Sequence, residues 1–210
     1  MAAARSRLVA ELTRVAGSTS ALVGLSVVPL LGSRDLEHAA IEINPDGRRR
    51  FPMASTAKVP LALTVLRLVD SGALALDQRL QLGLDDVRPG TGVLAQQLVS
   101  GGTAGTPVAH TVEELLELAL NDSDNCATDA LLALVGGPEA VQADLERLGL
   151  GQETHITRTF LELIRDRCGC AHIAAPASSS RGGGGDAPGA LSAVELTALL
   201  EGRMEVLPLR

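Results

Sequence analysis

The feature that most constrains the fold is a block of apolar helical segments between residues 55 and 149, bounded by residues that begin or end helices. The first segment has Leu and Val at helical spacing and ends at Ser71-Gly72. A capping box at 111–114 begins a second segment, and residues 127–135 form a third that is almost wholly apolar. The sequence therefore predicts a block of helices, interrupted by a looser, Gly-rich stretch over residues 73–109.

The near absence of aromatic residues restricts both the core and the partners. The chain of 210 residues is 46% hydrophobic, but its only aromatic residues are two Phe. The core must therefore be built from Leu, Val, Ala and Ile. Proteins that stack single-stranded nucleic acid need aromatic rings, and partners held through phosphates need a cationic face. Because the net charge is −7, we expect no nucleic-acid partner.

Both ends of the chain differ from the central block. Residues 3–16 have the apolar spacing of a helix, and residues 21–31 and 39–44 indicate two strands. Residues 173–190 are of low complexity, and a capping box begins a helix over residues 192–200. The expected order is a helix, two strands and then the block of helices.

The apolar run over residues 21–32 follows Arg14 and must be weighed as a signal peptide. Against that interpretation are Glu11 in the leader, Pro29 inside the run and the lack of a small-x-small cleavage site. We prefer a buried strand there. No apolar run is long enough to span a membrane. We therefore expect a cytoplasmic protein, as the sequence is written, with no membrane partner.

The three cysteines predict neither a disulfide framework nor a metal site, because their number is odd and small. Cys168, Cys170 and His172 offer three possible ligands, and His155 could be a fourth. Structural zinc sites use two ligand pairs that are well separated, and this spacing does not fit that pattern. We expect these to be ordinary loop residues and expect no metal or organic cofactor.

The first candidate for chemistry is the pair Ser55 and Lys58, the only lysine of the chain. If a helix begins at Ser55, the two side chains lie three residues apart and share a face. A serine hydroxyl needs a nearby base to become a nucleophile, and burial lowers the pKa of a lysine towards that role. Taken alone, this spacing is common by chance, and the simpler interpretation is a capping Ser beside a surface Lys.

The second candidate is the polar sequence Ser123-Asp124-Asn125 between two strongly apolar helices. Burying polar residues there would be costly without partners. Ser123 could relay a proton to a leaving group, and Asn125 could donate its amide to a substrate carbonyl. Asp124 could orient the loop by accepting backbone N–H bonds. The simpler interpretation is helix capping by Ser and Asp.

Together these elements resemble the serine β-lactamases of class A and the penicillin-binding proteins. The resemblance spans roughly residues 20–203 and includes Phe51-Pro-Met-Ala-Ser55, Ser123-Asp-Asn125 and Leu131-Leu132 before Gly136-Gly137-Pro138. It implies an α+β fold, in which an antiparallel sheet with flanking helices adjoins an all-helical domain and the active site lies between them.

That resemblance also implies a division of the chain into three parts. Residues 1–54 would supply a helix and a β-hairpin of the α/β part, and residues 55–190 the helical domain. Residues 191–210 would begin the return to the α/β part. The family has a K-T-G motif on a later strand, and this motif is absent here. We expect the C-terminal part of the sheet to be missing and the chain to be truncated.

A further departure concerns the R-x-E-x-x-x-N pattern, whose Glu activates the deacylating water in class A members. Arg158 fits the Arg, but Phe160 stands at the Glu position and Ile164 at the Asn position. Glu162 could substitute only if the backbone of the loop shifts. Since an aromatic ring cannot accept a proton from water, we expect slow deacylation.

The leading interpretation is a monomeric, β-lactamase-like serine hydrolase that acts on a small-molecule β-lactam or related acyl compound through an acyl-enzyme. Ser55 would be the nucleophile, Lys58 the general base, Ser123 a proton relay and Asn125 a substrate-binding amide. Glu162 is the candidate for the deacylating carboxylate. The alternatives are a penicillin-binding D,D-peptidase or esterase with slow deacylation, and a truncated chain without activity. Family members are typically exported, so the expected location becomes periplasmic or extracellular if the start of the sequence is misassigned.

Overall fold

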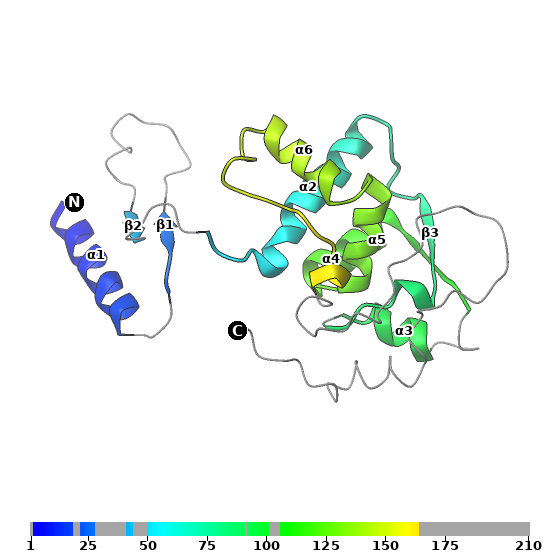
Figure 1. Ribbon diagram of the computed structural model, residues 1–210, viewed down its shortest axis with the longest axis horizontal. Coiled ribbons are helices and arrows are strands. Elements are labelled where there is room, and N and C mark those ends of the chain that lie inside the picture. The colour runs from blue at the N-terminus through cyan, green and yellow to red at the C-terminus, as the bar shows by residue number, and fades with distance from the viewer. Residues whose placement is uncertain are drawn as a thin grey trace. The chain divides into compact units, whose positions relative to one another are not determined.

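A computed structural model of the chain describes residues 2–18, 22–27, 41–43, 50–90, 92–100 and 106–163. It divides into two compact units, Met1–Pro52 and Met53–Arg210 (Figure 1). The first unit contains α1 (Ala2–Gly17), β1 (Leu25–Val27) and β2 (Ile41–Ile43). The described elements of the second unit are the 3-10 turns η2 (Ala54–Ala57) and η3 (Leu84–Asp86), strands β3 (Arg79–Leu82) and β4 (Val108–Thr111), and helices α2 (Lys58–Asp70), α3 (Leu94–Ser100), α4 (Val112–Asn121), α5 (Asn125–Val135) and α6 (Pro138–Arg147).

The first unit pairs β1 and β2 as an antiparallel hairpin, with Leu25 opposite Ile43 and Val27 opposite Ile41. The helix predicted over residues 3–16 is confirmed as α1. The two predicted strands are confirmed over their central residues only, since β1 and β2 have three residues each. Most of the remaining residues of the two predictions lie outside the described part of the chain.

The helices of the second unit begin and end where local side chains satisfy their free backbone groups. At the start of α4 the Thr111 hydroxyl accepts from the Glu114 N–H at 3.1 Å, and the Thr111 N–H donates to the Glu114 carboxylate at 2.9 Å. This is the predicted capping box, and it satisfies two N–H groups that the helix cannot. Gly136 caps the C-terminal end of α5, and Pro138 is the first residue of α6, as predicted.

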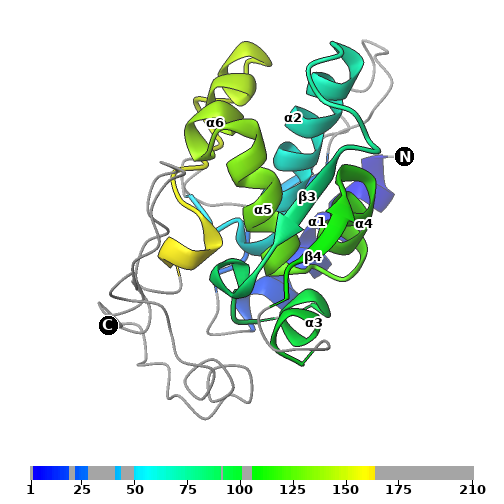
Figure 2. The ribbon, with the colours of Figure 1, turned by 90° about the vertical axis from the view of Figure 1, so that its right-hand side faces the viewer.

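The core of the second unit is aliphatic, as the composition requires. Helix α5 packs against α2, α4 and α6 (Figure 2). Its Ala127 and Leu131 have no exposed surface, and the same is true of five larger side chains elsewhere in the described core: Val65, Leu94, Val112, Leu115 and Val141. Burying a side chain of this size contributes roughly 1.5–3 kcal/mol. The block of packed helices is therefore confirmed.

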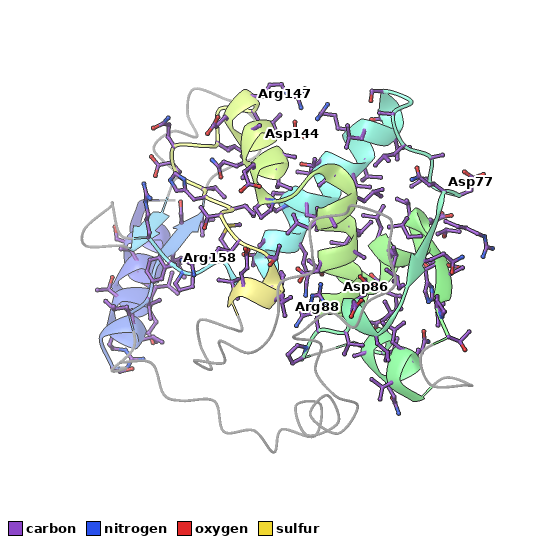
Figure 3. The ribbon with its side chains drawn as sticks, turned by 45° about the vertical axis from the view of Figure 1, so that its right-hand side comes forward. Asp77, Asp86, Arg88, Asp144, Arg147 and Arg158 are labelled. Carbon is purple, nitrogen blue, oxygen red and sulfur yellow. The ribbon has the colours of Figure 1, made fainter. Side chains whose placement is uncertain are left out.

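A partly buried ion pair joins α6 to α2. The Arg67 guanidinium of α2 contacts both carboxylate oxygens of Asp144 on α6, at 2.7 and 2.8 Å. Arg147, one helical turn after Asp144, reaches the same carboxylate at 3.0 Å (Figure 3). Burial alone would raise the pKa of Asp144, but hydrogen bonds from Arg67 and Thr64 and the charges of Arg67 and Arg147 together lower this pKa.

The stretch over residues 73–109 is more regular than the looser, Gly-rich segment that was predicted. It contains β3, η3, α3 and the first residues of β4. Strands β3 and β4 pair antiparallel, with Arg79 opposite Thr111 and Leu82 opposite Val108. The Val112 N–H extends this pairing by donating to the Gln78 carbonyl at 3.0 Å. Each strand has only four residues, and two-stranded pairs of this length depend on the structure around them. A local sequence pattern therefore did not reveal them.

Several expectations fall outside the described residues. They are the low-complexity segment over residues 173–190 and the helix over residues 192–200. Among the described residues, every helix is too short or too polar to cross a bilayer.

Candidate active site

Ser55 lies in a 3-10 turn that runs directly into α2. The α-helix itself begins at Lys58, three residues later than the start that the sequence suggested. Ala54, immediately before Ser55, has a φ of 47°, which is left-handed and uncommon for a residue with a side chain. Such a conformation costs on the order of 1–3 kcal/mol and persists only where the surrounding structure imposes it. The turn nevertheless places the Lys58 amine 3.4 Å from the Ser55 hydroxyl.

The loop between α4 and α5 brings Ser123 onto the same pair. Its hydroxyl donates to the Ser55 hydroxyl at 2.9 Å and accepts from the Lys58 amine at 2.8 Å. Ser123 also has a left-handed φ, of 56°. Among the described residues other than glycine, Ala54 and Ser123 are the two with a positive φ. They lie in the two segments that meet at the site. The three polar side chains form a closed triangle.

Lys58 is the centre of this cluster. Besides the Ser123 hydroxyl, its amine donates to the Ser123 carbonyl at 2.6 Å and to the Asn125 carboxamide oxygen at 3.0 Å. A charged lysine has three N–H donors, so these three contacts use all of them. The contact with the Ser55 hydroxyl is longer, at 3.4 Å. In the neutral amine the nitrogen has a lone pair, which can accept the proton of this hydroxyl.

The environment of Lys58 favours that neutral form. The residue is 3% exposed, and burial lowers the pKa of its ammonium group below the usual value. The carboxylates of Asp124 and Asp129 oppose this effect only in part. A lysine that loses its proton more readily than usual is a better base near neutral pH.

Asp124 holds the loop in place from inside the protein. One carboxylate oxygen accepts from the Cys126 N–H at 2.8 Å and from the Ala127 N–H at 3.0 Å, which caps α5. The other accepts from the Leu94 N–H at 2.9 Å. Asp124 has no exposed surface. It therefore joins the start of α5 to the start of α3.

Asn125 is the first residue of α5, and both ends of its carboxamide have partners. Its oxygen accepts from Lys58, and its nitrogen donates to the Pro89 carbonyl at 2.9 Å. The sequence did not single out the segment that supplies this carbonyl. A Cβ at Gly90 would overlap the Asn125 amide, and one at Gly92 would overlap the Asp124 carboxylate. The Pro89-Gly90 pair was the available signal, as a turn dipeptide.

Phe160 completes the surroundings of Lys58. The centre of its ring lies 4.7 Å from the lysine nitrogen, within the range of a cation–π contact. Asp129 of α5 fixes this segment by accepting from the Phe160 N–H at 2.8 Å and from the Leu161 N–H at 3.1 Å. Asp129 is itself paired with Arg88 at 2.7 Å, and both side chains are buried. Neither Arg88 nor Asp129 was identified from the sequence.

Glu162 lies in the short helical turn that Phe160 begins. Its carboxylate accepts from the Thr159 N–H at 2.8 Å and from the Thr159 hydroxyl at 3.1 Å, so that it caps this turn. Glu162 is exposed. Phe160 is thus the residue of this turn whose ring lies beside the Lys58 amine. The deacylating role suggested for Glu162 stays a prediction.

The residues considered for metal binding do not assemble among those described. Cys168, Cys170 and His172 lie outside the described part of the chain, and the described part contains no group of three acidic, His or Cys residues that could hold a metal ion. Cys126 is buried beside the Arg88 backbone, and burial raises its pKa to about 12. It is therefore a neutral thiol at physiological pH.

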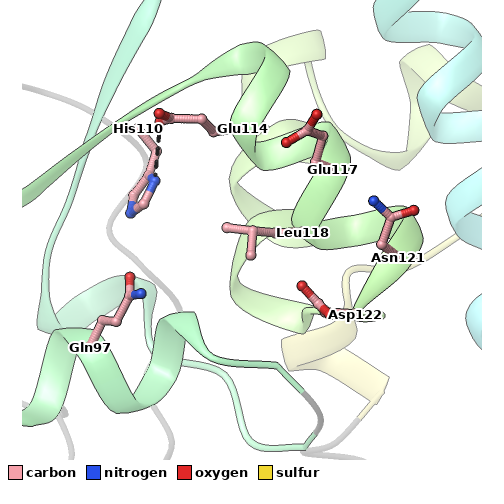
Figure 4. Close-up of a pocket in the computed structure, with 7 residues that line it drawn as sticks. All are labelled: Gln97, His110, Glu114, Glu117, Leu118, Asn121 and Asp122. Atoms are coloured by element: carbon pink, nitrogen blue, oxygen red, sulfur yellow. Dashed lines mark ion pairs between the residues drawn. The ribbon is translucent and has the colours of Figure 1, made fainter.

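A separate polar pocket lies between α3, β4 and α4 (Figure 4). Its volume is about 340 Å³, and its lining includes Gln97, His110 and Glu117. His110 contacts the Glu114 carboxylate at 3.3 Å through Nδ1. Ser55, Lys58 and Ser123 are not among the lining residues. The pocket is therefore not the place where the predicted chemistry would occur.

Comparisons with known proteins identify the family. A family model described as "Beta-lactamase enzyme family" matches residues 7–202. The extended-spectrum β-lactamase PER-1 of Pseudomonas aeruginosa is 34% identical over 146 residues, which are 70% of this chain and 44% of the relative. The β-lactamase VEB-1 of the same organism is 35% identical over 106 residues, or 50% of this chain and 33% of the relative.

A solved structure agrees with these sequence matches. The β-lactamase from Sphaerobacter thermophilus aligns with a TM-score of 0.59 and 35% identity, over 72% of this chain and 51% of that one. The chain spans less than half the length of the two curated relatives. The likeness confirms the predicted α+β fold. Because the family model covers most of the sequence and the relatives share its fold, the chain belongs to the β-lactamase enzyme family.

Proposed function

We propose that the chain acts as a serine hydrolase of the β-lactamase type, which opens the β-lactam amide through an acyl-enzyme on Ser55. The observation that supports this most directly is the hydrogen-bonded triangle of Ser55, Lys58 and Ser123. A nucleophile with a base and a proton donor in direct contact is the arrangement that acyl transfer requires. A buried lysine with a lowered pKa adds to this support.

Acylation follows from these contacts. The neutral Lys58 amine takes the proton of the Ser55 hydroxyl as the serine oxygen attacks the lactam carbonyl carbon. The new C–O bond forms, and the C–N bond of the lactam breaks. The Ser123 hydroxyl gives its proton to the departing nitrogen and regains one from Lys58, which it already contacts at 2.8 Å. The lysine returns to its neutral form, and the protein is left as an ester.

Asn125 is the proposed substrate-binding amide, and its present contacts define the condition for that role. Its nitrogen uses one N–H for the Pro89 carbonyl, so the second N–H of the same NH₂ group is the one that would donate to a substrate carbonyl. Its oxygen meanwhile orients Lys58 towards Ser123. Asn125 would therefore serve both the substrate and the base.

A second candidate function is that of a penicillin-binding peptidase, which is acylated by β-lactams but releases them slowly. The observation that favours it is the aromatic ring of Phe160 beside Lys58, where a hydrolase needs a proton acceptor for water. The two functions share the first half of the reaction and differ in the fate of the ester.

Mass spectrometry of the intact 210-residue chain after incubation with benzylpenicillin tests the shared half. We expect an adduct of the mass of the penicillin, absent from Ser55→Ala and present in Ser71→Ala, a matched change at the other end of α2. Nitrocefin turnover then separates the two functions, because only the hydrolase releases product repeatedly. If wild-type chain that is folded forms no adduct, both proposals are wrong and the chain is inactive.

A further inference from the structure

Arg88 is a buried charged residue that the proposed chemistry does not use (Figure 3). Its guanidinium donates to the Asp129 carboxylate at 2.7 Å, and to the backbone carbonyls of Asp85 and Val87 at 2.7 and 3.0 Å. Arg88 is 7% exposed and Asp129 5%. Taking two charges out of water is costly, and an apolar pair of similar size is often as stable. The pair is therefore a candidate for a role beyond stability.

The backbone of Arg88 is fixed as firmly as its side chain. Its N–H donates to the Sγ atom of Cys126, in the first turn of α5, at 3.1 Å. The same thiol donates to the Arg88 carbonyl over 3.7 Å. The next residue is Pro89, whose ring restricts φ. With the preceding peptide held on α5, one backbone angle, ψ of Pro89, is left to place the Pro89 carbonyl.

That carbonyl decides which end of the Asn125 carboxamide faces Lys58. It accepts from the Asn125 nitrogen at 2.9 Å, while the carboxamide oxygen accepts from the Lys58 amine at 3.0 Å. A carboxamide has an acceptor at one end and two N–H donors at the other. Turned over, it would direct its NH₂ group at the amine and its oxygen at the carbonyl. The observed orientation also leaves the second N–H for a substrate.

We propose that Arg88 is a positioning residue of the active site that acts through Asn125. Anchored by Asp129, it holds the Pro89 carbonyl in place. That carbonyl orients the Asn125 carboxamide towards Lys58 at one end and towards a substrate at the other. This inference rests on the function proposed above. Without the anchor the carbonyl can turn away, and the carboxamide loses the contact that fixes its orientation.

The charge of Arg88 also affects Lys58. The carboxylates that act on this lysine are those of Asp124 and Asp129, and both favour its ammonium form. The guanidinium, 2.7 Å from Asp129, opposes the second of these effects. Loss of the Arg88 charge should therefore raise the pKa of Lys58, and loss of the Asp129 charge should lower it. A merely loosened structure would admit water in both variants and raise this pKa in both.

These opposite directions can be measured without any activity. Lys58 is the only lysine, so 13C at lysine Cε gives a single signal, and its titration reports the pKa. We expect this pKa to rise by about half a unit in Arg88→Met and to fall by about as much in Asp129→Asn, less than the roughly 1–3 units caused by a charge in contact. Arg67→Met, which breaks another Arg–Asp pair on α2, is the matched control and should leave it unchanged. A rise in both variants of the pair, or no change, would overturn the inference.

Acylation of the full chain by benzylpenicillin at several concentrations is the second measurement. Arg88→Met should lower the saturating rate constant by about tenfold or more, because a misplaced base is a poor one. It should also raise the half-saturating concentration, because the Asn125 N–H is no longer aimed at the substrate. Arg88→Lys keeps the charge but lacks the planar fork that holds a carboxylate and two carbonyls. It should restore the pH profile of acylation but not the half-saturating concentration.

Thermal unfolding of each variant confirms that it is folded, and Arg67→Met should acylate like the wild type. If Arg88→Met does not fold, Arg88→Lys gives the same test through its half-saturating concentration. Acylation at the wild-type rate and half-saturating concentration by folded Arg88→Met or, failing that, Arg88→Lys would overturn the inference and leave the proposed function standing. No adduct on the folded wild type would instead refute the proposed function, and this inference with it.

Discussion

Replacing Asp124 by Asn tests how strongly its carboxylate stabilises the junction between α5 and α3. Asn is nearly the same shape and is as good a helix N-cap as Asp, so the bonds from Cys126 and Ala127 can persist. The atom that faces the Leu94 N–H becomes an NH₂ group, which cannot accept. Leu94 has no exposed surface, and a buried donor without a partner costs about 1–3 kcal/mol. We therefore expect Asp124→Asn to lower the free energy of unfolding by about 2 kcal/mol.

Asp124→Ala should cost more, because it also removes the cap. The lost cap adds about 0.5–2 kcal/mol to the cost at Leu94, which gives roughly 2–5 kcal/mol in all. Urea denaturation measures both variants, with a lower midpoint at an unchanged m-value. Asp122→Asn, an exposed change two residues earlier, is the control and should lie within about 0.5 kcal/mol of the wild type. The reasoning is refuted if Asp124→Asn is as stable as this control.

Three further outcomes are expected. Leu131→Ala, in the fully buried core, should lower the free energy of unfolding by about 2–5 kcal/mol in urea, whereas Leu63→Ala, at a position 52% exposed, should cost much less. Gly92→Ala should cost more than about 1 kcal/mol in the same assay, since φ is 122° there and the new Cβ meets Asp124; a neutral result would show that the loop can move. The pKa of Lys58 is lowered in the folded state. At pH values between this pKa and the ordinary lysine pKa, the unfolded chain therefore binds a proton that the folded chain does not. The free energy of unfolding should rise with pH across this range. Subtracting the pH profile of Lys58→Met isolates this rise, and a difference that falls with pH would contradict the lowered pKa.

The proposed function assigns the described residues to two tasks. Ser55, Lys58 and Ser123 form a proton-transfer unit, and Asp124 and Asp129 hold the two segments that adjoin it. Variants of the first group should change acylation with little effect on folding. Variants of the second group should change stability as well, because their carboxylates satisfy buried backbone N–H groups.

The sequence by itself determined the features that depend on near neighbours in the chain. A capping box joins residues three apart, and Ser55 and Lys58 share a face because they are three apart as well. The aliphatic core follows from composition, because only two aromatic residues were available. The motif at 123–125 was visible because polar residues between apolar helices demand partners.

Only the tertiary structure decided which distant residues meet. The β3–β4 pair joins segments 79–82 and 108–111, and neither strand is long enough to be recognised without the other. Ser123 reaches Lys58 across 65 positions of sequence, and Arg88 reaches Asp129 across 41. The resemblance to the family predicts that Phe160 stands at the position of a carboxylate, but it does not predict that the ring would lie over the Lys58 amine. Contacts of this kind arise from the packing of whole helices, whose relative positions are set by buried apolar surface rather than by any local pattern.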